Sequence, residues 1–303
     1  MRFDVTILGS SSATPIYNRN PTSQVLNINE RLYLIDCGEG TQQQMLRFDV
    51  KASRVDHIFI SHLHGDHYLG LVGLLSSLHL NGRKKPLFLF GPAPLIEIID
   101  LQLKYSETVL QYPLQFTATN AAKVETLIAN DDVTVETIPL DHRIPCTGFL
   151  FREKKRQRKL IKEEIERLTI PVAFYTAIKK GADYTTPEGK VYANELLSTD
   201  SDAPRTYCYC SDTLPVEKYF AQIATADLLY HEATFLNNML DRAKETHHTT
   251  ALQAGEIALN SKAKKLLIGH FSARYKVLDE LLDEARSVFQ NTELAIEGKT
   301  FVI

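Results

Sequence analysis

The sequence predicts a layered α/β fold. Short apolar runs rich in β-branched and aromatic residues recur along the chain with turn residues between them, which is typical of strands. Stretches with apolar residues at helical spacing lie between several of these runs. Strands and helices fall into two comparable sets, one before about residue 110 and one after about residue 200. This alternation favours strands and helices packed as layers around a core.

The individual elements follow from these two patterns. We expect strands at Phe3–Leu8, Ser23–Asn27, Leu32–Ile35, Val55–Ile60, Leu87–Phe90, Val133–Ile138, Phe149–Phe151, Arg205–Cys210, Leu228–Tyr230, Lys265–Ile268 and Leu294–Ile296. We expect helices at Gly40–Phe48, Tyr68–Leu80, Leu95–Tyr105, Pro215–Ala226, Thr249–Ser261 and Tyr275–Phe289. An apolar side of the kind these helical stretches carry is what lets a helix cover a sheet.

Length and composition narrow the class of protein. A chain of 303 residues with 44% hydrophobic residues is ordinary for a globular protein and excludes disordered, collagen-like and mini-protein classes. We expect residues 1–303 to form a single domain. A chain of this size buries a core without help from a metal, so a bound metal is expected to serve chemistry.

Charge and cysteine content exclude further classes. A net charge of −3 excludes a uniformly basic coat for nucleic acid but allows local basic patches. The four cysteines contain no CxxC pair, so neither a disulfide framework nor a thiolate zinc site is expected. No stretch approaches the roughly 18 apolar residues of a membrane span, and the start does not resemble a secretion signal. We expect a cytoplasmic protein without a membrane partner.

The middle of the chain differs from the rest. Residues 152–162 hold seven basic side chains and one acidic one. An amphipathic stretch follows to Leu168, and then the polar, glycine-containing segment Ala177–Lys190. This composition indicates an insertion, although a solvated charged helix alone would also explain the charge run.

The segment SHLHGDH, residues 61–67, carries the strongest chemical signal. Three histidines and Asp66 follow an apolar strand within six residues, immediately before a predicted helix. A turn of this kind converges its side chains on one point. Imidazole and carboxylate ligands suit zinc, with manganese or iron as possible occupants.

Three more residues, which lie later in the chain, complete a larger site. His142, Asp212 and His270 each follow a predicted strand. Taken singly, each is equally well explained as a turn or cap residue. Taken with the SHLHGDH segment they form the set of seven ligands of a two-metal site, with Asp212 placed to bridge both ions.

At this point the chain resembles the metallo-β-lactamase superfamily and, within it, the ribonuclease Z family. The resemblance covers nearly the whole chain. It is carried by LGS at residues 8–10, DCGEGTQ at 36–42, SHLHGDH at 61–67, LDH at 140–142, SDT at 211–213, HEATF at 231–235, HTT at 248–250 and HFSARY at 270–275. The SHLHGDH motif is shared by many hydrolases, whereas the last three segments are particular to ribonuclease Z. The chain has Ser211 where the family commonly has glycine, a change compatible with a backbone that is not at positive φ.

The resemblance implies a four-layer αβ/βα sandwich with an inserted arm, for which we take residues 162–197. It implies two zinc ions per chain, one held by His62, His64 and His142, the other by Asp66, His67 and His270, and both by Asp212. The catalytic residues it implies are Asp66, His248 and Glu232, with His248 as the acid that protonates the leaving 3′-oxygen and Glu232 as its orienting partner.

The function implied is an endoribonuclease that removes the 3′ trailer from precursor tRNA, leaving a tRNA 3′-hydroxyl and a trailer 5′-phosphate. The family is typically a homodimer whose arm clamps tRNA for the partner's site, and no nucleotide cofactor is expected. A small-molecule phosphodiesterase or arylsulfatase on the same two-metal scaffold is the first alternative. A non-catalytic RNA-binding protein that has kept the fold is the second.

The remaining polar residues near these motifs receive structural roles by default. We expect His57, His79 and His231 to be packed histidines, with contact to a metal ligand as the alternative for His231, and His247 to face solvent. For Asp36 and Glu39 two roles are open: each either caps a helix or contacts a metal-ligating residue.

Overall fold

The computed structural model describes residues 2–303, which form two compact units. The larger unit comprises residues up to Arg152 together with Thr206–Ile303, and the smaller comprises Glu153–Arg205. No helix among residues 2–303 is long and apolar enough to cross a membrane.

The larger unit is built on two seven-stranded sheets. In spatial order the first sheet contains β18 (Thr300–Val302), β1 (Phe3–Gly9), β2 (Ser23–Ile28), β3 (Arg31–Ile35), β4 (Val55–Phe59), β5 (Leu87–Pro92) and β6 (Leu114–Thr119). The second contains β17 (Thr292–Leu294), β16 (Leu266–Gly269), β15 (Leu228–Glu232), β14 (Thr206–Cys210), β9 (Thr147–Glu153), β8 (Val133–Pro139) and β7 (Thr126–Ala129). Strands β3 to β6 pair in parallel, as do β14 to β17.

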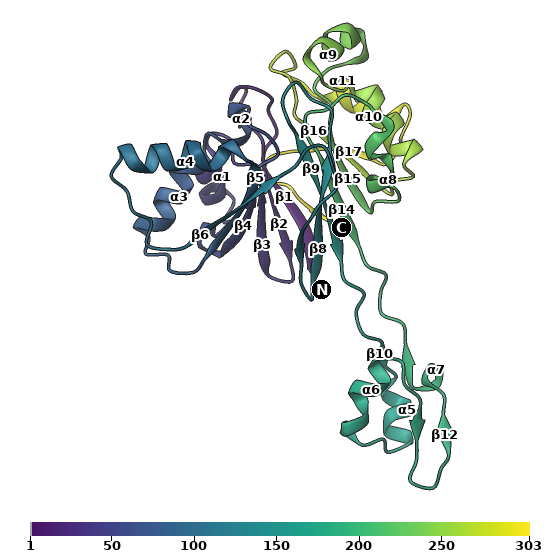
Figure 1. The fold of residues 1–303 in the computed structure, drawn as a ribbon. Coiled ribbons are helices and arrows are strands. Elements are labelled where there is room, and N and C mark those ends of the chain that lie inside the picture. Colours follow the sequence, from purple (N-terminus) through teal and green to yellow (C-terminus); the bar gives the residue numbers. More distant parts are fainter. Residues whose placement is uncertain (1) are drawn as a thin grey trace. The chain divides into compact units, whose positions relative to one another are not determined.

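Helices cover the outer face of each sheet (Figure 1). The first sheet is accompanied by α1 (Thr41–Arg47), α2 (Gly65–Tyr68), α3 (Leu71–Leu80) and α4 (Pro94–Tyr105), with the 3₁₀ turn η1 (Ala52–Arg54). The second is accompanied by η3 (Glu217–Tyr219), α8 (Phe220–Ile223), η4 (Asn237–Met239), α9 (Leu240–Thr246), α10 (Ala251–Asn260) and α11 (Asp279–Arg286). The predicted four-layer αβ/βα sandwich is confirmed.

Alternation along the strands explains why the layers stack. In β14, Tyr207 and Tyr209 pack into the core between the two sheets, whereas Cys208 and Cys210 pack into the core beneath the helices. Residues two apart in a strand share a face, so a strand that is apolar on both faces serves two cores at once. All four cysteines are free and buried.

The smaller unit has its own core. It contains β10 (Lys159–Leu160), α5 (Lys162–Arg167), η2 (Val172–Phe174), α6 (Tyr175–Lys179), β11 (Tyr184–Thr185), β12 (Val191–Tyr192), α7 (Asn194–Leu197) and β13 (Ser198–Thr199). The buried residues Ile165, Ile170, Ile178, Tyr184 and Leu197 pack together. Strands β10 and β13 pair with Leu160 opposite Ser198. The unit is wider than the arm predicted at 162–197.

The chain leaves and re-enters the larger unit at one place. Strands β9 and β14 are antiparallel neighbours, and Arg152 lies opposite Thr206 in their ladder. The whole segment Glu153–Arg205 therefore begins and ends at two paired residues of the second sheet.

Candidate metal centre

The histidines and carboxylates singled out from the sequence converge at strand ends. His62 and His64 lie in the turn after β4, and Asp66 and His67 lie in α2. His142, Asp212 and His270 follow β8, β14 and β16. In each of three groups of residues the ligand atoms lie within 4.8 Å of one another, and one group, Asp212, His248 and His270, shares two of its members with the other groups. The other two groups contain all seven candidate ligands: His62, His64, His142 and Asp212 form the first, and Asp66, His67 and His270 the second. We call these the first and the second half-site.

Asp212 joins the two half-sites. Its Oδ2 lies 3.5 Å from His62 Nε2 and 3.7 Å from His142 Nε2. Its Oδ1 lies 3.4 Å from His67 Nε2 and 3.2 Å from His270 Nε2. One carboxylate thus presents one oxygen to each half-site.

The spacing of ligand atoms fits a small divalent cation. In a tetrahedral zinc site with bonds of about 2.0–2.1 Å, neighbouring ligand atoms lie about 3.3 Å apart. His64 Nδ1 lies 3.1 Å from both His62 Nε2 and His142 Nε2, and Asp66 Oδ2 lies 3.3 Å from His270 Nε2. His67 Nε2 is buried without a hydrogen-bond partner among residues 2–303, so an otherwise unsatisfied nitrogen faces the second half-site.

Hydrogen bonds fix which ring nitrogen three of the histidines, His142, His67 and His270, present. The Nδ1 of His142 donates to the carbonyl oxygen of His247 at 2.9 Å, and that of His67 donates to Asp36 Oδ2 at 2.8 Å. The Nδ1 of His270 lies 2.9 Å from Thr234 Oγ1, whose hydroxyl is committed as a donor to Glu232. Each ring is left with Nε2 for a metal, the arrangement that partners around metal-binding histidines produce.

Electrostatics prepare the cluster for a cation. Burial lowers the pKa of His64 and of His142 to about 4, which favours the neutral imidazole that binds metals. Burial opposes ionisation of Asp66, but His67 and His270 outweigh it and hold the pKa of Asp66 below its usual range. Neutral His64 and His142 beside ionised carboxylates suit a divalent cation. Burial opposes protonation of His67, but Asp66, Asp212 and Asp36 outweigh it and raise the pKa of His67, so this ring releases a proton when it binds a metal.

His248 stands beside the half-sites with a carboxylate behind it. Its Nδ1 donates to Glu232 Oε1 at 2.9 Å. Burial lowers the pKa of His248, but the Glu232 carboxylate outweighs burial and raises the pKa to about 9. Glu232 is fully buried and also accepts from the Thr213 amide at 2.8 Å and the Thr234 hydroxyl at 2.6 Å. The pair holds a protonated imidazole beside the metal residues.

The start of α10 fixes the backbone that carries His248. Thr250 and Gln253 form a capping box, in which each side chain bonds the other's backbone N–H. The hydroxyl of Thr249 donates to the carbonyl oxygen of Thr213 at 2.7 Å. The segment that carries His248 is thereby tied to the segment that carries Asp212. Ser211, beside it, is not among the residues at positive φ, so serine is tolerated there.

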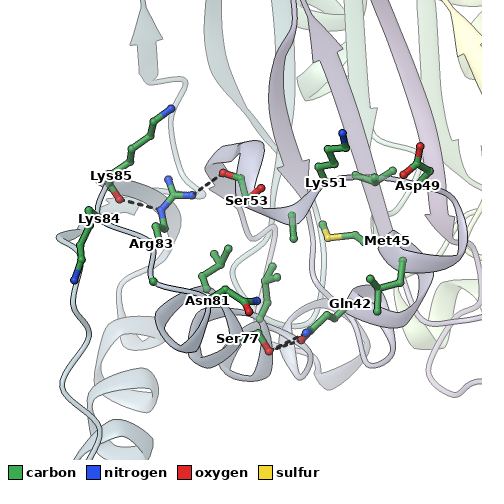
Figure 2. Close-up of a pocket in the computed structure, with 16 residues that line it drawn as sticks. Gln42, Met45, Asp49, Lys51, Ser53, Ser77, Asn81, Arg83, Lys84 and Lys85 are labelled. Carbon is green, nitrogen blue, oxygen red and sulfur yellow. Dashed lines mark hydrogen bonds between the residues drawn. The ribbon is translucent and has the colours of Figure 1, made fainter.

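The half-sites open onto a cavity of about 330 Å³ lined by Ser12, Ala13, His64, Gly65, Asp66, Leu69, Arg143, Asp212, His248 and His270. A wider cavity of about 530 Å³ lies between α1 and α3, where Gln42 and Ser77 are hydrogen-bonded (Figure 2). Asp49 is the sole carboxylate among its lining residues, and no histidine lines it. The chemistry therefore belongs to the smaller cavity.

Sequence reasoning missed two residues of this site. Thr234 bonds Glu232 and His270 together, and Arg143 is the only arginine or lysine among the residues that line the cavity. Two-residue periodicity at the end of β15 would have placed Thr234 on the face of Glu232. Nothing in the sequence around Arg143 distinguishes it from any other exposed arginine.

The histidines that were expected to have structural roles have different surroundings. His57 is stacked between Tyr33 and Phe88, and His231 is buried against Tyr219. His247 is only half-exposed, and its backbone carbonyl supports His142, so the expectation that it simply faces solvent is incomplete.

Asp36 and Glu39 have different roles. Asp36 is buried and bonds the His67 ring, while Glu39 is exposed. Neither caps α1, because Gly40 is the residue at its N-cap and no side chain bonds there.

Solved structures place the fold in a known class. The crystal structure of human tRNase Z, short form, matches with a TM-score of 0.71 at 26% identity and covers 98% of both chains. The metallo-β-lactamase fold protein YhfI from Bacillus subtilis matches with a TM-score of 0.69 at 19% identity over the whole of both chains. The protein has the metallo-β-lactamase fold, and its cluster of histidines and aspartates is that of a metal-dependent hydrolase.

Sequence relatives narrow the class. The ribonuclease Z of Bacteroides fragilis is 47% identical over 98% of both chains, and that of Bacteroides thetaiotaomicron is 48% identical over 100% of this chain and 96% of its own. The chain belongs to the ribonuclease Z family of metal-dependent endoribonucleases. Residues 3–157 also match the family model described as anti-Pycsar protein Apyc1. This part of the chain belongs to that family as well.

Proposed function

We propose that the protein is a zinc-dependent endoribonuclease that removes the 3′ trailer from precursor tRNA, leaving a 3′-hydroxyl on the tRNA and a 5′-phosphate on the trailer. The observation that carries this proposal is the His248–Glu232 pair beside the two half-sites in a chain of the ribonuclease Z family. The small-molecule alternatives share the metal residues, so the substrate must be tested directly.

The residues that would hold the metals are those of the two half-sites. His62, His64 and His142 would hold one zinc ion, Asp66, His67 and His270 the other, and Asp212 both. Two zinc ions held by these residues would lower the pKa of a bound water and offset negative charge at phosphorus.

The chain itself supplies the proton for the leaving group. His248 lines the cavity and is bonded through Nδ1 to Glu232, so its Nε2–H is the proton available to the departing 3′-oxygen. Glu232 keeps the imidazole protonated and holds its ring in place. This is the arrangement of a general acid with an orienting carboxylate.

The smaller unit supplies features suited to RNA. Lys154, Lys155, Lys179 and Lys180 make no ion pair with any residue in the described range 2–303, and three of the four are exposed. Unpaired cations of this kind are available to neutralise phosphates. We take residues 162–197 as an arm that clamps precursor tRNA, within a homodimer in which each arm serves the partner's site. The four free, buried cysteines suit the reducing cytoplasm, where we place the protein.

The experiment that tests this proposal maps the position at which precursor tRNA is cleaved. Purified protein reconstituted with zinc is incubated with a precursor tRNA, with and without encoded CCA, and both product ends are sequenced. A single cut after the acceptor stem that leaves a 3′-hydroxyl supports the proposal. Turnover of small phosphodiesters or sulfate esters without any tRNA cleavage would replace it with the alternative. Sedimentation of the same sample decides between monomer and dimer.

Removing the arm is expected to separate the two substrates. Ile161 donates its N–H to the Leu197 carbonyl at 2.9 Å, so residues 162–197 can be replaced by a short Gly/Ser linker without stretching the chain. Turnover of a small phosphodiester should survive, whereas affinity for precursor tRNA should fall. The log–log salt dependence of binding should flatten by about one unit for each phosphate that the shortened protein no longer neutralises. Unchanged tRNA affinity and salt slope in a folded deletion variant would refute the arm.

Glu232→Gln is expected to move the alkaline limb of the pH–rate profile to lower pH. A general acid must be protonated, so cleavage declines as pH rises through the pKa of His248. Removal of the Glu232 charge takes away the main cause that raises this pKa. The profile is measured with precursor tRNA, and with an activated phosphodiester as the control that needs no acid. A limb that stays in place would show that Glu232 does not set the protonation of His248.

A further inference from the structure

Glu297 is a carboxylate in the turn between β17 and β18 that takes no part in the proposed mechanism. Its Oε1 accepts from the backbone N–H of Asn20 at 2.6 Å and from that of Ser10 at 3.3 Å. Its Oε2 accepts from Gln44 Nε2 at 2.6 Å, and the same nitrogen donates to the Leu8 carbonyl at 2.8 Å. One carboxylate therefore gathers both ends of the loop between β1 and β2, together with helix α1.

That loop reaches the second half-site at two points. The Ala13 N–H donates to Asp66 Oδ2 at 2.7 Å. Ser10 and Ser12 exchange backbone hydrogen bonds with Phe271, at 2.9 and 3.0 Å, immediately after His270. His270 itself has a left-handed backbone with φ of 59°, a conformation that needs support from its surroundings. The first half-site has no hydrogen bond of this kind with residues 10–13.

We propose that Glu297 is a positioning residue for the second half-site. Its carboxylate holds the loop of residues 9–20 so that Ala13 and Phe271 keep Asp66 and His270 at the spacing a metal requires. This inference rests on the proposed two-metal centre and adds a residue outside it. Support of this indirect kind is common around metal ligands, where its removal typically costs about 10–100-fold in affinity.

The donor set explains why the residue is a carboxylate. All three groups bonded to Glu297 are donors, and an ionised carboxylate only accepts. An amide or a protonated carboxyl would turn an N–H or O–H toward Gln44 Nε2. Gln44 cannot rotate its amide to adapt without breaking its bond to Leu8.

Protonation is accordingly a natural probe of the same interaction. Burial raises the pKa of Glu297 to about 7, while Arg47 of α1 opposes the rise. Arg19 of the loop is the other charged group that faces it. The carboxylate therefore changes between acceptor and donor within the pH range in which the protein can be studied.

The test compares Glu297→Gln with Glu293→Gln. Glu293 is a carboxylate four positions away that pairs with Lys265 and Lys299, so it controls for removal of a nearby charge. Metal-free protein is titrated with zinc against a chromophoric chelator at pH 8, and unfolding of the metal-free protein confirms the fold. Cobalt absorption reports the geometry of each half-site independently of activity.

We expect Glu297→Gln to bind one ion as tightly as the wild type and the other about tenfold more weakly or worse. Glu293→Gln should match the wild type. Lowering the pH from 8 to 6 should widen the gap between the two affinities more in the wild type than in Glu297→Gln, because the variant has no ionisable acceptor there. Equal weakening of both ions, no weakening, or the same widening in both proteins would overturn the proposal.

A wild type that binds fewer than two ions would instead refute the two-metal centre on which the inference rests. If Glu297→Gln does not fold, Glu297→Asp decides the question. Aspartate keeps an acceptor on a shorter stem, so it should weaken the same single ion by a smaller factor. An aspartate variant that weakens both ions or neither would equally overturn the role of Glu297.

Discussion

Asp212→Ala is expected to lose more bound metal than any other single alanine change among the seven candidate ligands. Each of the other six serves one half-site, whereas Asp212 presents Oδ1 to His67 and His270 and Oδ2 to His62 and His142. Metal content should fall from two ions per chain toward none, and cleavage of both tRNA and small phosphodiesters should disappear with it, because both substrates depend on the same ions.

Metal analysis of the seven variants, each dialysed against the same zinc-buffered solution, checks this ranking. Asp141→Ala is the matched control, because Asp141 precedes His142 but belongs to neither half-site. The bridging role is wrong if Asp212→Ala keeps two ions while His142→Ala or His270→Ala does not.

His248→Ala is expected to keep both ions and yet to cleave precursor tRNA roughly 10²–10⁴-fold more slowly, the usual scale for removal of a general acid. A nitrogen of its ring lies within 4.8 Å of the ligand atoms of Asp212 and His270, but its Nδ1 is bonded to Glu232 and it is not one of the seven residues assigned to the metals. The leaving 3′-alkoxide of RNA needs a proton, whereas the leaving group of bis(p-nitrophenyl) phosphate hardly does. Turnover of that activated diester should therefore be spared.

The neighbouring histidine provides the control for this prediction. His247 has φ of 56°, and asparagine tolerates that conformation. Its contact with His142 is made by the backbone carbonyl, so His247→Asn should leave both activities near wild type. Equal losses on both substrates in His248→Ala would point to a role in metal binding or folding instead.

Much of the site could be predicted from the sequence because its residues follow directly after predicted strands. An apolar run followed at once by histidine or aspartate is visible in one dimension, and parallel strands bring such ends together. That reasoning extends to His142, Asp212 and His270. It does not extend to Thr234 or Glu297, whose importance comes from hydrogen bonds between segments far apart in the chain.

The strands and helices that the sequence did not predict lack a regular spacing of buried apolar residues. Strand β6 alternates between half-buried and exposed residues, and only Ala243 is buried in α9. The helix predicted at Tyr68–Leu80 begins three residues later, as α3, and the short helix α2 before it was not predicted. Gly70 lies between the two, where an added Cβ would lie 2.2 Å from the Gly38 carbonyl oxygen. A close approach of that kind depends on the tertiary fold and leaves no mark on local periodicity.

The pairing of Arg152 with Thr206 has a consequence for how such a protein can be remodelled. Arg152 and Thr206 are partners in one ladder, so the two ends of the segment between them are held side by side. A tight hairpin would have its ends held in the same way as those of the folded segment. Lengthening a closed loop costs only about 0.6 kcal/mol for each doubling. The position between Arg152 and Thr206 is therefore a graft point, where inserted segments of different size can be exchanged without altering the pairing of β9 with β14.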